Sequence, residues 1–155
     1  MGSFCYSYSR LIVARGTMDW EKVDSLLKKH EGLRFTLYKC PAGKLTIGYG
    51  HNIEDRGISE KCAEFILKED REIAYRQVKN AVSDFCILTE ARQYVLIDMC
   101  FNMGISKLLA FKKMLKALKN KDYSMAAKEM LDSKWAAQVP ERAKELSEIM
   151  EKGKW

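Results

Sequence analysis

Apolar residues recur at helical spacing over most of the chain, and the first such stripe begins directly after Asp19. An Asp at this place can cap a helix, and Gly32 can end one because glycine readily adopts positive φ. We therefore expect a helix between these two residues that buries one side. The side in question carries Trp20, Val23, Leu26 and Leu27.

From residue 33 to residue 49 the period shortens to two, which is typical of strands. The alternating apolar residues are Leu33, Phe35 and Leu37, and then Leu45, Ile47 and Tyr49. Between the two runs lies Pro41-Ala42-Gly43, so this part is predicted to be a hairpin. Gly48 and Gly50 indicate a place where backbone or ligand comes close. The polar stretch 52–57 is expected to be a loop.

The rest of the chain has helical periodicity. Ser59 and Thr89 are expected to cap helices over about 60–80 and 90–102. Further helices are predicted from Leu108 to about Asn120 and over 123–131 and 140–151, the last with Pro140 at its first position. The 60–80 helix is expected to bury Ala63, Ile66, Leu67, Ile73, Ala74 and Val78.

The helix over 90–102 is rich in apolar residues and is expected to be central and nearly buried, so Asp98 inside it should be paired or hydrogen-bonded. A small hairpin among helices predicts the α+β class, with a β-containing lobe near the N-terminus and a helical lobe after it.

The length and charge of the chain limit its possible domain organisation and its possible partners. With 155 residues it can form one ordinary domain with a real core, expected over 17–155. Residues 1–16 are expected to be a disordered leader or an expression remnant, with Met18 a plausible alternative start. No apolar run approaches membrane-spanning length. The net charge of +6 favours an anionic partner, either nucleic acid or a bacterial wall.

The five cysteines are scattered and form no CxxC pair, so neither a zinc site nor a redox motif is indicated. Cys62, Cys86 and Cys100 lie among apolar residues and are expected to be small buried side chains. Cys5 lies in the leader. Cys40 lies in the predicted turn and is the one that stands out.

Several short motifs, in matching order, carry a resemblance to a known family. They are His30-Glu31-Gly32-Leu33-Arg34, Tyr38-Lys39, Gly43, Thr46-Ile47-Gly48-Tyr49-Gly50-His51, Phe101-Asn102-Met103-Gly104, Trp135 and Pro140-Glu141-Arg142-Ala143. Over roughly 18–150 the chain resembles the T4-type phage lysozymes (endolysins) of glycoside hydrolase family 24. The resemblance implies a two-lobed lysozyme-like fold. It also implies a muramidase that cleaves the β-1,4 bond between N-acetylmuramic acid and N-acetylglucosamine in peptidoglycan.

The family's catalytic pattern is a Glu, then an Asp or sometimes a Cys, then a Thr, and here Glu31, Cys40 and Thr46 hold those positions. Glu31 suits the general acid that protonates the leaving oxygen. Cys40 stands where the better-known pattern has Asp. Two roles are open for it: to orient or deprotonate water together with Thr46, or to attack the sugar directly as a thiolate. Taken alone, each of the three could be an ordinary helix-end, turn or strand residue.

The resemblance also implies supporting residues. Phe101 and Asn102 would bind substrate, although the family usually has Gln beside that Phe. Arg142 would pair with Glu31, and His51 would fix the loop after the hairpin. No metal or organic cofactor is implied. The expected partner is peptidoglycan rather than nucleic acid. The protein is expected to be a monomer without a membrane anchor and to stay in the host cytoplasm until lysis.

Two other functions compete with hydrolysis. A lytic transglycosylase cuts the same bond without water, but it needs no water-positioning pair such as Cys40 and Thr46. A non-catalytic module that binds wall polymer or nucleic acid is supported by a predicted lysine face on the 108–120 helix. Its members are Lys112, Lys113, Lys116 and Lys119.

Overall fold

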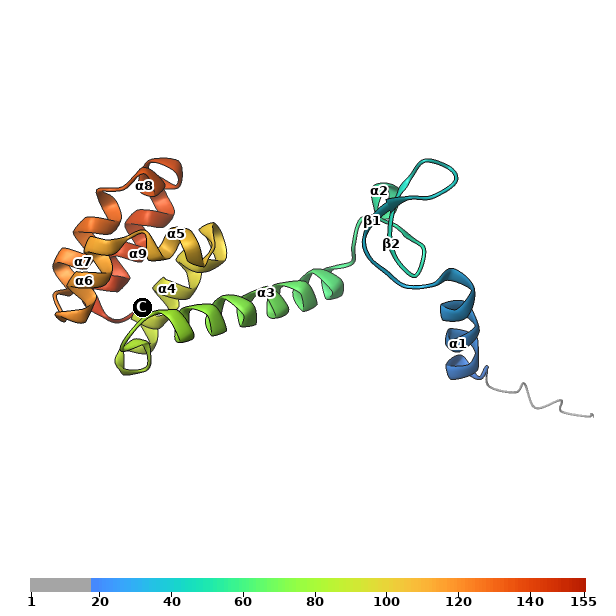
Figure 1. Cartoon of the computed structure of the whole chain (residues 1–155), viewed down its shortest axis with the longest axis horizontal. Helices are drawn as coiled ribbons and strands as arrows, with labels where there is room; N and C mark the ends of the chain where they lie inside the picture. The colour runs from blue at the N-terminus through green and yellow to red at the C-terminus, as the bar shows by residue number, and fades with distance from the viewer. Residues whose placement is uncertain (1–17) are drawn as a thin grey trace, which may run out of the picture. The chain divides into compact units, whose positions relative to one another are not determined.

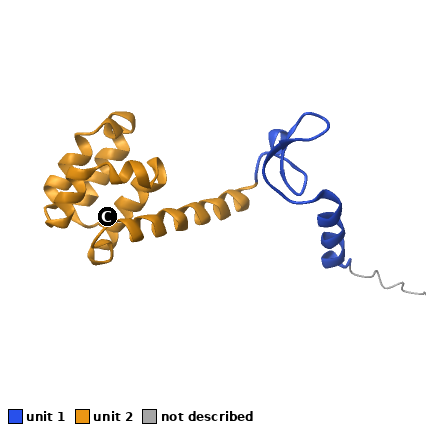
Figure 2. Ribbon diagram, viewed as in Figure 1, with its two compact units in different colours: residues 1–58 blue, residues 59–155 orange. Residues whose placement is uncertain are grey.

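The computed structural model describes residues 18–155, so the predicted leader and Cys5 lie outside the described residues. The chain divides into two compact units, residues 1–58 and 59–155, drawn in blue and orange in Figure 2. We call them the N-terminal and the C-terminal unit and describe each by itself.

The first helix of the N-terminal unit, α1 (Trp20–Glu31), begins and ends as predicted. The Asp19 side chain accepts a hydrogen bond from the Lys22 N–H (3.0 Å), and Gly32 ends the helix with φ at +66°. The predicted burial is wrong, because no α1 residue is buried and Trp20 keeps 67% of its surface exposed. The amphipathic pattern therefore predicted the helix correctly but not what covers it.

A three-stranded antiparallel sheet follows, with the strand order β1–β2–β3. The strands are β1 (Arg34–Lys39), β2 (Leu45–Gly48) and β3 (His51–Asn52). The hairpin prediction is confirmed, since Tyr38 pairs with Thr46 and the Gly43 N–H closes the turn on the Cys40 carbonyl (2.8 Å).

The prediction of a loop over 52–57 is wrong, because a single helical turn, α2 (Ile53–Arg56), forms there. The Asn52 side chain caps this turn by accepting from the Asp55 N–H (3.1 Å), and Gly57 ends it. Four residues are too few to show helical periodicity, so only the cap and the glycine could have indicated this helix.

The C-terminal unit is helical throughout its described secondary structure (Figure 1). The predicted caps Ser59 and Thr89 and the first-turn Pro140 are confirmed, and the helix over 123–131 is found as predicted. The elements are α3 (Glu60–Ala81), the 3₁₀ turn η1 (Phe85–Ile87), α4 (Glu90–Met103), α5 (Ile105–Leu109), α6 (Lys112–Lys119), α7 (Tyr123–Leu131), α8 (Lys134–Gln138) and α9 (Pro140–Lys152).

The predicted single helix from Leu108 to Asn120 is wrong, because the chain breaks between α5 and α6 at Ala110 and Phe111. Phe111 leaves the helical path and packs edge-on against Trp135, with the ring centroids 6.3 Å apart. A distant aromatic partner therefore overrides a continuous local pattern. The short helix α8 that carries Trp135 was not predicted either.

The core of this unit forms around α4, which confirms the central position predicted for that helix. Val95, Leu96 and Met99 have no exposed surface, and α7 and α9 add Met130 and Met150. Asp98 is paired, as predicted, since it accepts from Arg142 Nε (2.7 Å) and from the Tyr94 hydroxyl (3.2 Å).

Burial along α3 is only partly as predicted. Ala74 and Val78 are buried, but Ala63, Ile66, Leu67 and Ile73 are exposed, because only the later part of the helix packs against the core. Among the cysteines, Cys100 is buried as expected, whereas Cys62 and Cys86 are exposed.

Arg92 of α4 binds the carbonyl groups at the C-terminal end of α9. Its Nε donates to the Met150 carbonyl and its Nη2 to the Glu151 carbonyl, both at 2.8 Å, while the guanidinium carbon lies 3.4 Å from the centre of the Tyr123 ring. Gly153 has a φ of +70°, and a Cβ built on it would lie 2.6 Å from the guanidinium carbon. The guanidinium thus occupies the space that a side chain at position 153 would need.

We expect Gly153→Ala to lower the free energy of unfolding by about 2–3 kcal/mol, because it adds a left-handed alanine and displaces Arg92 from its carbonyl partners. In an Arg92→Ala background the same substitution should cost only about 1 kcal/mol of backbone strain. Urea unfolding of the four proteins measures both costs. Equal costs in the two backgrounds would mean that Arg92 and position 153 are not coupled.

Candidate active site

Glu31 is the last residue of α1, and its position depends on the close approach of a glycine. A Cβ built on Gly50 would lie 2.8 Å from Glu31 Oε2, and Gly50 has a φ of +74°. The carboxylate therefore lies directly against the Gly50 backbone, as the sequence suggested for that glycine. Gly48, the other glycine that the sequence indicated, also has positive φ, but a Cβ built on it would have no neighbouring atom within 4 Å.

The Glu31 carboxylate lines a hollow of about 370 Å³ in the N-terminal unit. Asp24, Leu27 and Lys28 of α1 form one side, and Tyr49 and Gly50 form the other. Neither Cys40 nor Thr46 lines this hollow. The three predicted catalytic residues thus belong to one unit but form two local groups.

Cys40 and Thr46 form the second group, joined by one carbonyl oxygen. The Lys44 carbonyl accepts both the Cys40 N–H and the Thr46 hydroxyl, each at 3.0 Å. Thr46 is buried, with 2% of its surface exposed, whereas Cys40 is partly exposed. Solvent can therefore reach Cys40 in the turn, whereas Thr46 of β2 is covered.

The surroundings of Cys40 favour the thiolate. Hydrogen bonding from the Lys44 backbone lowers the pKa of the thiol most, and the backbone of Ala42 and the Thr46 side chain lower it further, against the effect of desolvation. Because the Thr46 hydroxyl has a single proton, it can serve either the Lys44 carbonyl or the sulfur at one time. The thiolate is the reactive form of cysteine, so this turn suits chemistry at sulfur.

His51 lies in β3, and its Nε2 is 2.7 Å from the Gly57 carbonyl. The contact links β3 to the residue after α2, which suits a residue that fixes this loop. The role itself stays a prediction.

The candidate residues of the C-terminal unit line two separate hollows. Phe101 and Arg142 line one of about 610 Å³ together with Asp98, and Asn102 lines another of about 820 Å³. The Asn102 amide oxygen is occupied, because it accepts from Trp135 Nε1 (2.8 Å).

The carboxylate that Arg142 meets is Asp98, and the Asp98 bond raises the pKa of the guanidinium. Sequence reasoning expected Asp98 to be paired but did not name Arg142 as its partner. The pairing of Arg142 with Glu31 involves residues of different units and stays a prediction.

Comparison with known proteins gives the family. A family model described as "Phage lysozyme" matches residues 28–151. The chain belongs to the phage lysozyme family. It is 28% identical over 160 residues to "Probable T4-type lysozyme 1" of Dictyostelium discoideum, covering 84% of this chain and 94% of that one. It is 34% identical over 120 residues to "Endolysin" of Acyrthosiphon pisum secondary endosymbiont phage 1, covering 75% and 78%.

As a member of the phage lysozyme family, the chain is a glycosidase with a lysozyme-type, peptidoglycan-lytic function. The observed small sheet and helical unit agree with the lysozyme-like α+β fold that the sequence predicted. Within residues 18–155, no helix is both long enough and apolar enough to cross a bilayer. In the same range, no three His, Cys, Asp or Glu side chains gather as metal ligands.

The place of Gly50 in this lysozyme gives a test of the Glu31 site. We expect Gly50→Ala to lower lytic activity about 10-fold or more, because the new methyl group displaces the carboxylate from its position. Gly48→Ala is the matched control, since it adds similar backbone strain without meeting Glu31. Initial lysis rates, compared at equal folded fraction, provide the measurement. Similar losses for the two variants would show that the contact with Glu31 has no influence on activity.

Proposed function

We propose that the chain hydrolyses the β-1,4 bond between N-acetylmuramic acid and N-acetylglucosamine. In this proposal Glu31 is the general acid, and Cys40 and Thr46 prepare the attacking water. The observation that supports it most is the shared Lys44 carbonyl, which brings the thiol and the hydroxyl of the family's catalytic pattern to one turn.

The proposed reaction needs one proton donor and one group that activates water. Glu31 protonates the glycosidic oxygen as the bond to the anomeric carbon breaks. The Cys40 thiolate takes a proton from a water, with the Thr46 hydroxyl as the second contact that orients it. The resulting hydroxide adds to the anomeric carbon, so the atoms of one water divide between the two product sugars.

The other candidate residues have supporting roles in this proposal. Phe101 and Asn102 bind the glycan, and Arg142 and His51 support the site. Peptidoglycan is the substrate of a monomeric enzyme that needs no bound metal or organic cofactor. The name "Endolysin" of the phage relative supports the proposal that this protein reaches the wall when the host cell lyses.

Lysis of chloroform-treated Gram-negative cells tests the proposed function. The purified chain should lower the turbidity of the suspension at a rate proportional to its concentration. A basic protein that only binds the wall would sediment with the cells and leave their turbidity unchanged.

The anomer formed first tests the role of Cys40. Activation of water on the face opposite the leaving group inverts the centre, so we expect the α anomer in NMR spectra recorded during the first turnovers. A β anomer formed first would instead support direct attack by the thiolate through a covalent intermediate.

A further inference from the structure

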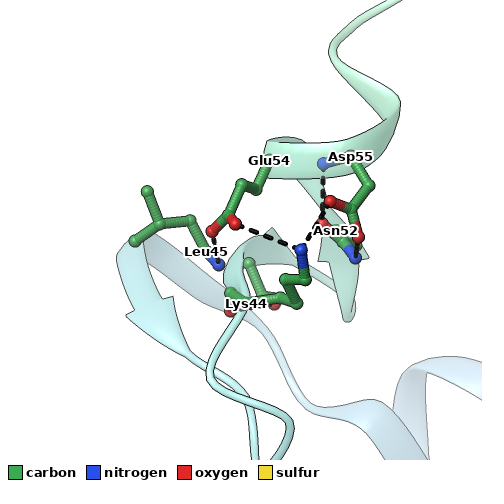
Figure 3. Close-up of polar contacts among 6 residues, drawn as sticks. Lys44, Leu45, Asn52, Glu54 and Asp55 are labelled. Atoms are coloured by element: carbon green, nitrogen blue, oxygen red, sulfur yellow. Dashed lines mark hydrogen bonds and ion pairs between the residues drawn. The ribbon is translucent and has the colours of Figure 1, made fainter.

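The peptide group between Lys44 and Leu45 is hydrogen-bonded on both of its sides. Its carbonyl oxygen accepts from Cys40 and Thr46, as described above. Its N–H donates to Glu54 Oε2 of α2 at 3.0 Å (Figure 3). A peptide group is planar and turns as one body. The Glu54 bond therefore fixes the direction of the carbonyl that organises Cys40 and Thr46.

Glu54 is itself held in place by the Lys44 side chain. Lys44 Nζ lies 3.3 Å from Glu54 Oε1 and 2.8 Å from Asp55 Oδ1, and the Asn52 amide holds the other Asp55 oxygen at 3.0 Å. The two oxygens of Glu54 thus bind two parts of one neighbouring segment, the ammonium of Lys44 and the N–H of Leu45. We call Lys44, Glu54 and Asp55 the α2 clamp.

The α2 clamp contributes little to the stability of the fold. The side chains of Lys44 and Glu54 each keep 42% of their surface exposed, and that of Asp55 keeps 50%. Ion pairs this exposed contribute little to the free energy of folding. Their specific geometry against a backbone N–H agrees better with a role in orientation.

Lys44, whose ammonium belongs to the α2 clamp, has a raised pKa. The bonds to Asp55 and Glu54 raise the pKa of Lys44 most, and a negative charge on Cys40 raises it further. The Lys44 backbone makes the largest contribution to the low pKa of Cys40, so the position of this backbone bears on the reactivity of the thiol.

We propose that Glu54 is a positioning residue for the Cys40–Thr46 pair, acting through the Lys44–Leu45 peptide group, and that the Lys44 ammonium holds Glu54 in place. The inference rests on the proposed function for its catalytic meaning. Its structural content, the effect of α2 on the Cys40 thiol, can be measured without lytic activity.

The experiment compares Glu54→Gln with Glu54→Ala. Both remove the same negative charge, but only glutamine keeps an oxygen that can accept from the Leu45 N–H. We use a Cys5→Ser, Cys62→Ser, Cys86→Ser background, in which Cys40 and the buried Cys100 remain, and follow alkylation by iodoacetamide against pH. The midpoint for Cys40 should be higher in the alanine than in the glutamine variant, by about half a pH unit or more.

Two further measurements complete the test, the kcat of the Glu54 variants and the alkylation midpoint of a Lys44 variant. We expect kcat to fall about 10-fold in Glu54→Ala and no more than about 3-fold in Glu54→Gln, with KM little changed in both. Lys44→Met should also raise the alkylation midpoint, because it removes the ammonium that holds Glu54 Oε1 at 3.3 Å and so loosens the bond from the Leu45 N–H to Glu54. Glu148→Gln, which breaks an exposed pair with Lys152 (3.0 Å) in α9, is the control and should change neither quantity.

Equal midpoints and equal kcat values for the alanine and glutamine variants would overturn the positioning role. An unchanged midpoint in Lys44→Met would overturn the role of Lys44 in holding Glu54. If the unaltered chain does not lyse cells while the midpoints still separate as expected, the proposed function fails and the effect of α2 on Cys40 stands. Unfolding curves recorded for each variant show that folded proteins are compared.

Discussion

Glu31→Gln should abolish lysis, lowering the initial rate about 10³-fold. Glutamine has nearly the size and shape of glutamate but has no acidic proton to give to the leaving oxygen. Because Glu31 is exposed at the end of α1 and its carboxylate touches the Gly50 backbone, the substitution should leave the fold intact. Turbidity loss of chloroform-treated cells measures the rate.

Glu21→Gln is the matched control, since Glu21 is an exposed carboxylate in the first turn of the same helix. Its lysis rate should equal that of the unaltered chain. Substantial lysis by Glu31→Gln would remove the general acid from this account, and a loss in both variants would indicate an effect on α1 as a whole.

Substitutions of Cys40 should give the second-largest effect and an ordered series. Cys40→Ser should lower the lysis rate about 10²-fold, because a hydroxyl does not ionise in the range where the thiol does. Cys40→Asp should keep much of the activity, since a carboxylate can also accept a proton from water. Cys62→Ser, a change at an exposed thiol of the C-terminal unit, is the control and should have no effect.

The pH dependence of the same series tests the thiolate. Hydrogen bonds from the turn lower the pKa of Cys40, so the thiolate forms at lower pH than in an unfolded chain, where the midpoint is about 8.5. The activity of the unaltered chain should rise as pH increases through this lowered midpoint. Cys40→Asp should lack that rise, because its carboxylate is ionised already above about pH 4. Full activity of Cys40→Ser would exclude a thiolate from the mechanism.

Helix ends and the hairpin could be predicted from the sequence because their signals are local. Asp19, Ser59 and Thr89 each satisfy a backbone N–H within three residues of themselves, and Gly32 ends α1 without steric cost. The Pro41–Gly43 turn is equally local. In each case the residue and its partner are visible in one short window of sequence.

Features that depend on distant partners could not be predicted in this way. Phe111 breaks a helix because Trp135 is beside it, and the pairing of Arg142 with Asp98 spans 44 positions. Amphipathic stripes predicted α1 and α3 but not their exposure, because periodicity does not say what covers an apolar face.

The residues of the candidate site also divide into those with a signal in the sequence and those that depend on a partner elsewhere in the chain. The spacing of Glu31, Cys40 and Thr46 matched a family pattern, so the sequence alone could nominate all three. The bond that the Leu45 N–H donates to Glu54 was missed because the expected loop at 52–57 is a helical turn. The Asn52 cap and Gly57 were the available signal for that turn.

Mass spectrometry of the fragments released from purified peptidoglycan is the sharpest test of whether the chain hydrolyses the proposed bond. Hydrolysis of the proposed bond predicts fragments that end in a reducing N-acetylmuramic acid, and digestion in ¹⁸O water should label that end. Fragments lighter by one water, with 1,6-anhydro-muramic ends and no label, would contradict hydrolysis and show a lytic transglycosylase. Reducing N-acetylglucosamine ends would contradict the proposed bond.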